Sequence, residues 1–418
     1  MLSRQNNDLL TQTGPGTPMG ELLRRYWIPA LMSSEIPDPD GEPVKVRLLG
    51  ENLIAYRDTD GNVGLVDEVC PHRGASLWYA RNEDCGLRCI YHGWKIDATG
   101  AVVDTPNEET LLQVQTTAYP VYESGGLVWA YMGPPALVPP KRRFIWTDLP
   151  ESQRVITKVW VEGNFLQGVE GGIDSSHVGF LHRQFDPSTW GGIGTAIRVK
   201  APRLEVEQTA YGFRYAALRS LPDGRQNIRI TPFILPFHTY VPTARADNNL
   251  WHAWVPRDDG SNWMYDVRFS TDGPFDLEGE HERIRGIGLN GDFRPERTLG
   301  NKHLQSREAM RTLNFSGIEG VKNQDYAIVE TMGPIVDRTR EHLGASDRAV
   351  AAARRLLLSA LRSFQEGEEP PGLDPSIPLE RVVGVDVTAT AELDWRQACP
   401  LPAGAALPER ETVALEEA

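Results

Sequence analysis

Two short loops, each carrying one cysteine and one histidine, constrain this chain more than any other feature. The first reads Cys70-Pro71-His72, and the second, after a gap of sixteen residues, reads Cys89-Ile90-Tyr91-His92. Thiolate sulfur and imidazole nitrogen are common protein ligands of transition metals. A chain that folds around these loops is expected to bring them together at a metal centre.

The pairing of ligands favours a [2Fe–2S] cluster of the Rieske type, in which two cysteines hold one iron and two histidines hold the other. Gly74 and Gly93 allow the backbone to approach such a cluster closely. A structural zinc site is the alternative, but zinc modules usually begin with paired cysteines and end with paired histidines. The other two cysteines, Cys85 and Cys399, are expected to be small buried structural side chains.

A second motif follows, in which Asp174 precedes His177 by three residues and His177 precedes His182 by five. Two histidines and a carboxylate form the facial triad of non-haem Fe(II) oxygenases, which leaves positions open for O₂. On a regular helix the two histidines would point about 140° apart, so the helix must loosen or end between them. Alone, the pair would be ordinary partly buried histidines; after a cluster motif in the same chain it predicts an iron site.

The third ligand of this iron is not determined by spacing. Three carboxylates lie near a predicted helix over residues 318–332 that ends at Gly333-Pro334. Each could instead be a surface carboxylate near a helix end. The candidates are Asp325, Glu330 and Asp337.

The composition excludes some classes of function. The net charge of −14 disfavours binding to nucleic acid or to an anionic membrane surface. The first residues lack the apolar core of a signal peptide, and no apolar run approaches the roughly 20 residues that span a bilayer. We therefore expect a cytoplasmic protein with neither a nucleic-acid nor a membrane partner.

The chain divides into an N-terminal arm (residues 1–40), a β-rich domain (41–140), a catalytic domain (141–365) and a C-terminal tail (366–418). Hydrophobic periodicity alone predicts strands and a late helix. The proline-rich segment 133–140 cannot continue a sheet and marks the main boundary. In the arm, a short helix is expected over 20–27. In the β-rich domain, strands are expected over 44–49, 53–56, 63–66, 94–96, 101–103 and 127–132.

The catalytic domain is expected to begin its sheet with a hairpin or a long bent strand over 203–218. Further strands are predicted over 228–241 and 250–269, followed by a long polar loop over 274–305. A clear helix is predicted over 346–364, with Ser346 as its N-cap.

The loop sequences from Cys70 to Ser76 and from Cys89 to Lys95 resemble those of the Rieske non-haem iron aromatic ring-hydroxylating oxygenases. Segments 14–20 and 24–27 resemble the phthalate dioxygenase-like branch of their α (oxygenase) subunits, and the resemblance extends to about residue 363. It implies an α+β protein, in which a Rieske [2Fe–2S] β-sandwich is followed by a catalytic domain with an antiparallel sheet wrapped around a helix, the helix-grip fold. The C-terminal tail is then expected to pack on the catalytic domain. It also implies a Rieske cluster on Cys70, His72, Cys89 and His92, and a mononuclear Fe(II) on His177 and His182.

The resemblance assigns further roles. The segment around Asp325 looks like the one that supplies the third iron ligand. Asp174 matches an aspartate that bridges a cluster histidine of one subunit and an iron histidine of its neighbour, here His92 and His177; a helix N-cap is the alternative. Such a bridge implies a homotrimer or a stacked hexamer.

Ser175 and Arg203 match positions that recognise substrate carboxylates in phthalate dioxygenases; a helix cap and a solvated strand end are the alternatives. The second arginine expected on the later strands is not found, because residues 237–240 stand there, flanked by Arg229 and Arg245. Four phenylalanines could form an aromatic wall of the substrate site or belong to the general core: Phe165, Phe180, Phe233 and Phe237.

The expected function is that of an oxygenase component which receives electrons from a separate NAD(P)H-dependent flavin and iron–sulfur reductase. With O₂ it would hydroxylate a small aromatic substrate, an aromatic carboxylate in a phthalate-like dioxygenation. O-demethylation or monooxygenation of an aryl ether such as a methoxybenzoate is the alternative. A Rieske-type electron carrier or a zinc-stapled binding protein is more remote, since either would leave the second motif unexplained.

Overall fold

The computed structural model describes residues 1–189, 194–242, 249–274 and 276–407. The chain forms two compact units, one contiguous (residues 13–141) and one that combines residues 1–12 with the chain from residue 142 onward. The arm expected over residues 1–40 is thus divided between them, because α1 (Arg4–Thr11) packs against helices of the discontinuous unit. Within the described ranges, none of the helices combines the length and the apolar character that crossing a bilayer requires.

The contiguous unit consists of small antiparallel sheets, with the strand orders β1-β10-β9, β2-β3-β4 and β5-β6-β7-β8. The predicted strands all appear, within one or two residues of the expected limits. Their bounds are β1 (Trp27–Met32), β2 (Val44–Leu48), β3 (Glu51–Arg57), β4 (Val63–Asp67), β5 (Arg81–Glu83), β6 (Gly86–Arg88), β7 (Lys95–Ile96), β8 (Val102–Asp104), β9 (Val121–Ser124) and β10 (Leu127–Tyr131).

The helix expected over residues 20–27 is shorter and starts earlier. Thr17 caps α2 (Pro18–Leu23) by accepting a hydrogen bond from the Gly20 N–H, and Pro18 occupies the first turn, where its missing N–H costs nothing. Residues from Trp27 onward instead pair with β10, which buries them in the sheet. Tertiary pairing has overridden the local helical pattern here.

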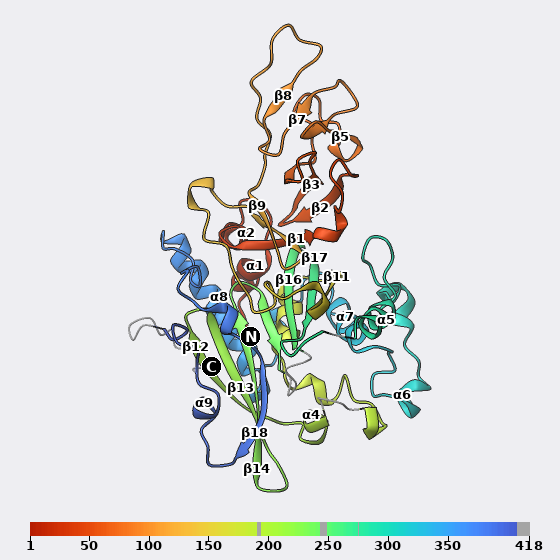
Figure 1. Cartoon of the computed structure of the whole chain (residues 1–418). Coiled ribbons are helices and arrows are strands. Elements are labelled where there is room, and N and C mark those ends of the chain that lie inside the picture. Colours follow the sequence, from red (N-terminus) through yellow and green to blue (C-terminus); the bar gives the residue numbers. More distant parts are fainter. Residues whose placement is uncertain (190–193, 243–248, 275, 408–418) are drawn as a thin grey trace. The chain divides into compact units, whose positions relative to one another are not determined.

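The discontinuous unit is built on one eight-stranded antiparallel sheet with the order β11-β17-β16-β15-β14-β13-β12, to which β18 adds beside β14 (Figure 1). The hairpin predicted over 203–218 is the β12–β13 pair. The strand bounds are β11 (Arg154–Glu162), β12 (Arg203–Thr209), β13 (Gly212–Ser220), β14 (Arg225–Ile234), β15 (His238–Val241), β16 (Asn249–Asp258), β17 (Ser261–Phe269) and β18 (Val385–Thr390).

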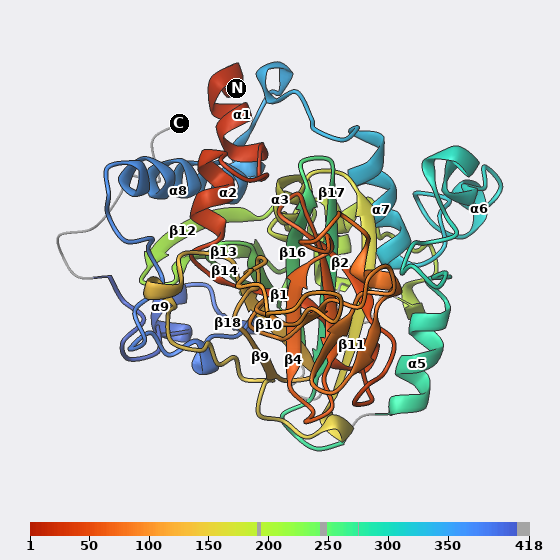
Figure 2. The same ribbon diagram turned by 90° about the horizontal axis from the view of Figure 1, so that it is seen from above.

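Helices α3 (Phe165–Gly172), α7 (Val321–Thr331) and α8 (Arg348–Gln365) pack against this sheet, α3 on β15 to β17, α7 on β11, and α8 on β12 and β13 (Figure 2). α8 buries an apolar stripe at helical spacing, which includes Ala353, Leu357 and Leu361. It begins one residue after Asp347, so the prediction of Ser346 as the N-cap was wrong. The fold is α+β, with its helices packed against an antiparallel sheet.

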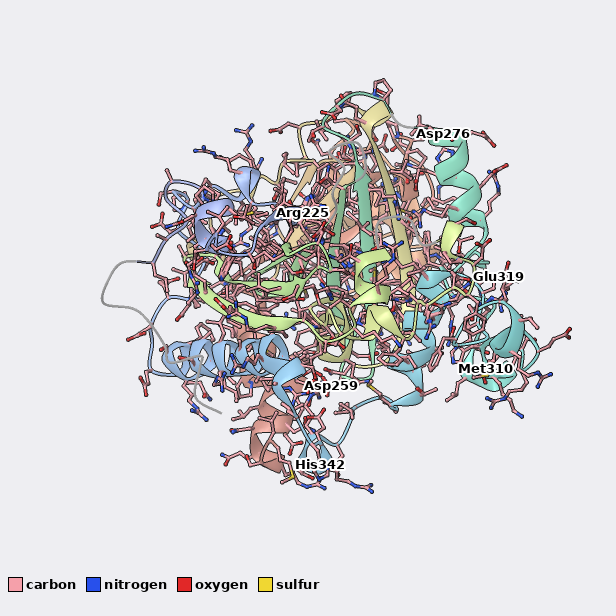
Figure 3. All side chains as sticks on the ribbon, turned by 90° about the horizontal axis from the view of Figure 1, so that it is seen from below. Arg225, Asp259, Asp276, Met310, Glu319 and His342 are labelled. Carbon is pink, nitrogen blue, oxygen red and sulfur yellow. The ribbon has the colours of Figure 1, made fainter. Side chains whose placement is uncertain are left out.

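Two segments in which we predicted no helix or strand contain some regular structure. The polar loop over 274–305 holds α5 (Leu277–Arg285), and its early acidic and late basic residues suit the helix dipole. The tail supplies β18, whose register runs from Arg225↔Thr390 to Ile230↔Val385; Arg225, labelled in Figure 3, marks the start of β14. The shorter helices are α4 (Gly194–Arg198), α6 (Ala309–Thr312) and α9 (Trp395–Ala398).

Candidate metal centres

The two loops that carry Cys70 and Cys89 have matching backbone hydrogen bonds. In each, the glycine four residues after the cysteine donates its N–H to the cysteine carbonyl at 2.9 Å, Gly74 to Cys70 and Gly93 to Cys89. The two glycines have φ of +78° and +79°, which a residue with a Cβ adopts only at a cost. The repeated sequence pattern therefore forms two similar loops, and both cysteines join one hydrophobic cluster of the contiguous unit.

The histidines of these loops lie side by side. The ring centroids of His72 and His92 are 4.4 Å apart, and the His72 ring stacks on Trp94 at 4.5 Å. His72 Nδ1 is buried and has no hydrogen-bond partner among the described residues. A buried ring nitrogen without a partner is costly, and coordination of a metal would satisfy it. Two thiols and two imidazoles gathered in this way fit the ligand set of a Rieske cluster.

The two thiols interact with each other. Burial, together with the nearby Cys89 thiol, raises the pKa of Cys70 to about 11. Backbone N–H groups of His72 and Arg73 point at the sulfur and act in the opposite direction, since they stabilise the thiolate. A bound iron would shift the balance to the thiolate, because coordinating thiols lose their protons.

In the discontinuous unit, His177, His182 and Asp325 converge although they come from separate segments. α3 ends at Gly172, and His177 begins a 3₁₀ turn, His177–Gly179. The chain has therefore left the α-helix before the two histidines, as their spacing required. Asp325 lies in the second turn of α7. One potential ligand atom from each residue lies within 4.8 Å of the other two.

The distances within this group describe a compact donor set. Nε2 of His177 is 3.1 Å from Nε2 of His182. Oδ1 of Asp325 is 3.1 Å from Nε2 of His182 and 3.7 Å from Nε2 of His177. Burial alone would raise the pKa of Asp325, but the imidazole of His182 holds this pKa below its ordinary value. Two imidazoles and an ionised carboxylate fit the facial triad of a mononuclear iron site.

Gln324, which the sequence analysis missed, orients one of these histidines. Its Oε1 lies 2.7 Å from His182 Nδ1, and its Nε2 donates to the Ile318 carbonyl at 2.8 Å, which determines the orientation of the amide. Because an amide oxygen only accepts, Nδ1 of His182 carries the proton and Nε2 is left free to bind a metal. Its position next to Asp325 in the sequence was the available signal.

Asp174 lies beside the other histidine. Its Oδ2 is 3.6 Å from Nδ1 of His177, and its Oδ1 accepts a 2.6 Å hydrogen bond from the Ser176 N–H. Burial opposes protonation of His177, but Asp174 and then Asp325 raise the pKa of this imidazole above its ordinary value. Asp174 follows the end of α3, and the N-cap of the 3₁₀ turn that begins at His177 is Ser176, so the alternative role of Asp174 as an N-cap was wrong.

A buried charge cluster lies next to the triad and was also missed by the sequence analysis. Lys322 Nζ is 2.8 Å from Asp266 Oδ2 and 3.0 Å from His252 Nε2. Although burial alone would raise it, the pKa of Asp266 is held far below its ordinary value by Lys322 and His252. Lys322 also lowers the pKa of Asp325, so this cluster helps to keep the candidate ligand ionised.

The other two candidates for the third ligand lie elsewhere. Glu330 faces His303, with 3.5 Å between Oε2 and Nε2, and lines a cavity of about 280 Å³ to which none of the three triad residues contributes. Burial raises the pKa of Glu330 to about 7. Asp337 is the N-cap of the 3₁₀ helix Arg338–Arg340. The structure therefore brings Asp325, and neither of these, to the histidines.

The two predicted substrate-binding residues lie on opposite faces of the sheet. Ser175 is buried, and its Oγ is 3.0 Å from the hydroxyl of Tyr215 on β13. Arg203 pairs with Leu218, and because side chains alternate along a strand, it lies on the face opposite to Tyr215. Its side chain is 69% exposed and forms an ion pair with Glu205. The surroundings of Arg203 are thus those of a solvated strand end.

Other expected residues divide between core and surface. Phe165, Phe233 and Phe237 are fully buried and belong to the core, whereas Phe180 is 46% exposed. Cys399 is buried in a cluster with Trp395, as expected, but Cys85 is only half-buried, at a turn with positive φ. Arg245 lies outside the described residues.

Comparisons with known proteins agree with this division into two metal-binding parts. Residues 26–120 match the Rieske [2Fe-2S] domain, and residues 130–407 match the family described as LigXa C-terminal domain like. The chain is 42% identical to the phthalate 4,5-dioxygenase oxygenase subunit of Pseudomonas putida, over 95% of this chain and 94% of that protein. It is 38% identical to the 3-chlorobenzoate-3,4-dioxygenase oxygenase subunit of Comamonas testosteroni, over 89% and 92%.

A third relative, the 5,5'-dehydrodivanillate O-demethylase oxygenase subunit of a Sphingobium strain, is 34% identical over 91% of this chain and 87% of its own length. Among solved structures, dicamba monooxygenase bound to dicamba shares the fold with a TM-score of 0.62 and 17% identity, over 83% of this chain and 99% of that one. The chain belongs to the family of Rieske non-haem iron oxygenase subunits. It is accordingly an oxidoreductase that uses a Rieske [2Fe–2S] cluster and a mononuclear iron.

Proposed function

We propose that this chain is the oxygenase component of a system that hydroxylates an aromatic carboxylate in a phthalate-like dioxygenation. The observation that carries the proposal is the convergence of His177, His182 and Asp325, whose ligand atoms lie within 4.8 Å of one another. The relatives that act on phthalate and on 3-chlorobenzoate, at 42% and 38% identity, support an aromatic acid as substrate.

In this proposal, His177 Nε2, His182 Nε2 and the Asp325 carboxylate hold Fe(II), and Cys70, Cys89, His72 and His92 hold the cluster. When bound, the iron supplies the open positions at which O₂ is activated. The side chains around the site orient the ligands and control their protonation. Gln324 holds the proton on His182 Nδ1, and Lys322 helps to keep Asp325 ionised.

The partners are proposed on the same basis. A separate reductase with a flavin and an iron–sulfur centre passes electrons from NAD(P)H to the cluster, and the system works in the cytoplasm. Asp174, which lies beside His177 Nδ1, accepts a hydrogen bond from His92 of a neighbouring copy, and this makes the active form a homotrimer or a stacked hexamer. Light scattering of the purified protein, giving the mass of three or six chains, tests this assembly.

The ligand assignment is tested by iron analysis and by EPR of dithionite-reduced protein. The wild type should hold about three irons per chain and give a Rieske signal. Asp325→Ala should hold about two irons with the signal kept, and Asp337→Ala, which changes the capping aspartate, should behave as the wild type. Zinc in place of iron, with no EPR signal, would contradict the proposed function.

A second candidate reaction, O-demethylation of an aryl ether, is favoured by the 34% identical O-demethylase subunit. The two reactions share the metal centres and differ in product. Turnover of a methoxybenzoate with release of formaldehyde, and no turnover of phthalate, would favour the second candidate.

A further inference from the structure

Two buried arginines, Arg219 on β13 and Arg229 on β14, share the face of the sheet that Ser175 contacts. The register pairs Tyr215 with Thr231, Ala217 with Arg229 and Arg219 with Asn227. Directly opposed residues point to the same side, so Arg219 and Arg229 lie on the Tyr215 side of the sheet. Arg219 is 1% exposed and Arg229 is 4% exposed. Arginine is rarely buried to this extent without a charged partner.

Arg219 uses only part of its hydrogen-bonding capacity within the protein. Its Nε donates to the Val199 carbonyl at 2.9 Å, and one terminal nitrogen donates to the Ser175 carbonyl at 3.2 Å. The other terminal nitrogen, Nη1, is buried and has no acceptor among the described residues. A guanidinium has five N–H donors in a planar fork that matches a carboxylate, and an unsatisfied buried donor is costly.

Arg229 lies beside a carboxylate, although its Nε, like Nη1 of Arg219, makes no hydrogen bond within the described part of the chain. Its Nε lies 3.3 Å from the Asp386 carboxylate, supplied by β18, and its Nη2 donates to the Pro242 carbonyl at 3.0 Å. Asp386, which forms this ion pair with Arg229, also accepts a hydrogen bond from Asn227. Burial and, after it, repulsion from Arg229 lower the pKa of Arg219 to about 10. The described groups therefore leave a surplus of positive charge in a buried place, which an anion would offset.

The arginine pair adjoins the iron segment. Arg219 contacts the backbone of Ser175, the residue that follows Asp174, and the hydroxyl groups of Ser175 and Tyr215 lie 3.0 Å apart. Asp174 in turn lies beside His177. The free guanidinium nitrogen thus lies near the two hydroxyl groups, and the hydroxyl groups lie near the candidate iron site. An aromatic acid needs such an arrangement, with donors for its carboxylate close to the iron that acts on its ring.

We propose, on the basis of the function above, that Arg219 binds the carboxylate of the substrate with its free Nη1, that Arg229 reinforces the positive charge, and that Arg203 takes no part. Ser175 and Tyr215, whose hydroxyl groups are bonded to each other, supply one further O–H donor to the same carboxylate. Charge-assisted pairing of a planar guanidinium with a carboxylate is the strong form of this interaction. In this proposal, residues of β13, above all Arg219, give the enzyme its specificity for acids.

The test is calorimetric binding of phthalate, without O₂, to protein whose three irons per chain and Rieske signal have been verified. The variants are Arg219→Gln, Arg219→Lys and the control Arg203→Gln, which changes an exposed arginine on the opposite face. Arg219→Gln should weaken binding by about 10- to 100-fold. Arg219→Lys should fall between this variant and the wild type, because it keeps the charge and loses the fork. Arg203→Gln should bind as the wild type.

Several outcomes would overturn the assignment. They are unchanged phthalate binding by Arg219→Gln with its irons in place, a comparable loss in Arg203→Gln, or no measurable binding of phthalate and benzoate to the wild type with its irons in place. If Arg219→Gln fails to retain iron, the phthalate affinities of Arg219→Lys and Arg203→Gln are compared instead. Equal phthalate affinities of these two variants would exclude the proposed role of Arg219. Because iron content is measured separately, failure of the carboxylate site is distinguished from failure of the metal assignment.

Discussion

Nδ1 of His182 and Oε1 of Gln324 lie 2.7 Å apart, so the residue just before Asp325 orients a histidine of the same site. α7 thereby contributes both a candidate ligand and the group that holds another ligand in place. Partners of this kind typically tune metal affinity by one to two orders of magnitude.

Replacing Gln324 by Leu should weaken Fe(II) binding at the mononuclear site by about 10- to 100-fold, because the His182 ring loses its orienting acceptor. The Rieske EPR signal should not change. Competition with a ferrous chelator measures the affinity. Gln305→Leu is the matched control, since Gln305 also hydrogen-bonds a backbone carbonyl but at a different site. Equal iron affinity in Gln324→Leu and the wild type would refute the orienting role.

Two adjacent glycines at the end of α3 should respond oppositely to alanine. A Cβ on Gly172 would lie 2.0 Å from Cη2 of Trp254, whereas a Cβ on Gly171 would meet nothing within 4 Å. Gly172→Ala should therefore destabilise the protein by about 1–3 kcal/mol, and more if Trp254 cannot move. It should also lower mononuclear iron content, because α3 leads directly into Asp174 and His177.

Gly171→Ala is the control for this pair and should be neutral or stabilising by up to about 1 kcal/mol, as alanine favours helix. Urea unfolding measures both. Similar stabilities for the two variants would contradict the close packing of α3 on β16.

The buried carboxylate Glu170 is expected to be a major contributor to stability. It contacts Arg354 at 2.6 Å and Arg338 at 2.9 Å. Within the described residues, Glu170→Gln leaves the buried Arg338 without a carboxylate and Arg354 with Glu341 alone, and it should cost up to about 3–5 kcal/mol near neutral pH. Urea unfolding measures the loss, with the exposed Glu282→Gln as control.

The loss should depend on pH in a defined direction. Burial opposes ionisation, but the two arginines hold the pKa of Glu170 below its usual value of 4.5 in the folded protein. The unfolded chain therefore takes up the proton first as the pH falls, and the stabilisation disappears below about 4.5. The difference between wild type and Glu170→Gln should be full at pH 6–8 and shrink below that point; a constant difference down to pH 3 would contradict the ionic role.

Glu330 should show the opposite pH dependence. Burial raises its folded-state pKa from 4.5 to about 7, so the folded protein retains a proton that the unfolded chain releases. Between these two values the stability of the wild type should fall as the pH rises. Above pH 7, Glu330→Gln should be more stable than the wild type by about 1–2 kcal/mol, after screening by nearby water. Urea unfolding at pH 5 and pH 8 tests this; an advantage of the variant at pH 5 that equals that at pH 8 would exclude it.

Many of the strands and the two histidines of the iron site could be predicted because the signals are local. The short spacing between His177 and His182 already required the chain to leave the helix, and the structure shows a 3₁₀ turn there. Asp325 could not be separated from Glu330 and Asp337 by spacing, because their distances to the histidines depend on how α7 packs against the rest of the unit.

The position of Arg203 could not be predicted for a related reason. A shift of one residue in strand register moves a side chain to the other face of a sheet. Only the pairing of Arg203 with Leu218 shows that it faces away from Ser175, and the same register places Arg219 toward it. The strand β18 was missed because its partner, β14, is remote in sequence and its own pattern is weak.

The separation of residues 1–12 from the rest of their unit has a consequence for biosynthesis. Residues 13–141 emerge from the ribosome as an uninterrupted unit, whereas α1 packs against α8, which begins at Arg348. At roughly 5–20 residues per second, α1 waits on the order of 20–70 s for this partner. The nascent chain thus has time to complete the part that carries Cys70 and Cys89 before the part that carries His177 and Asp325 can close.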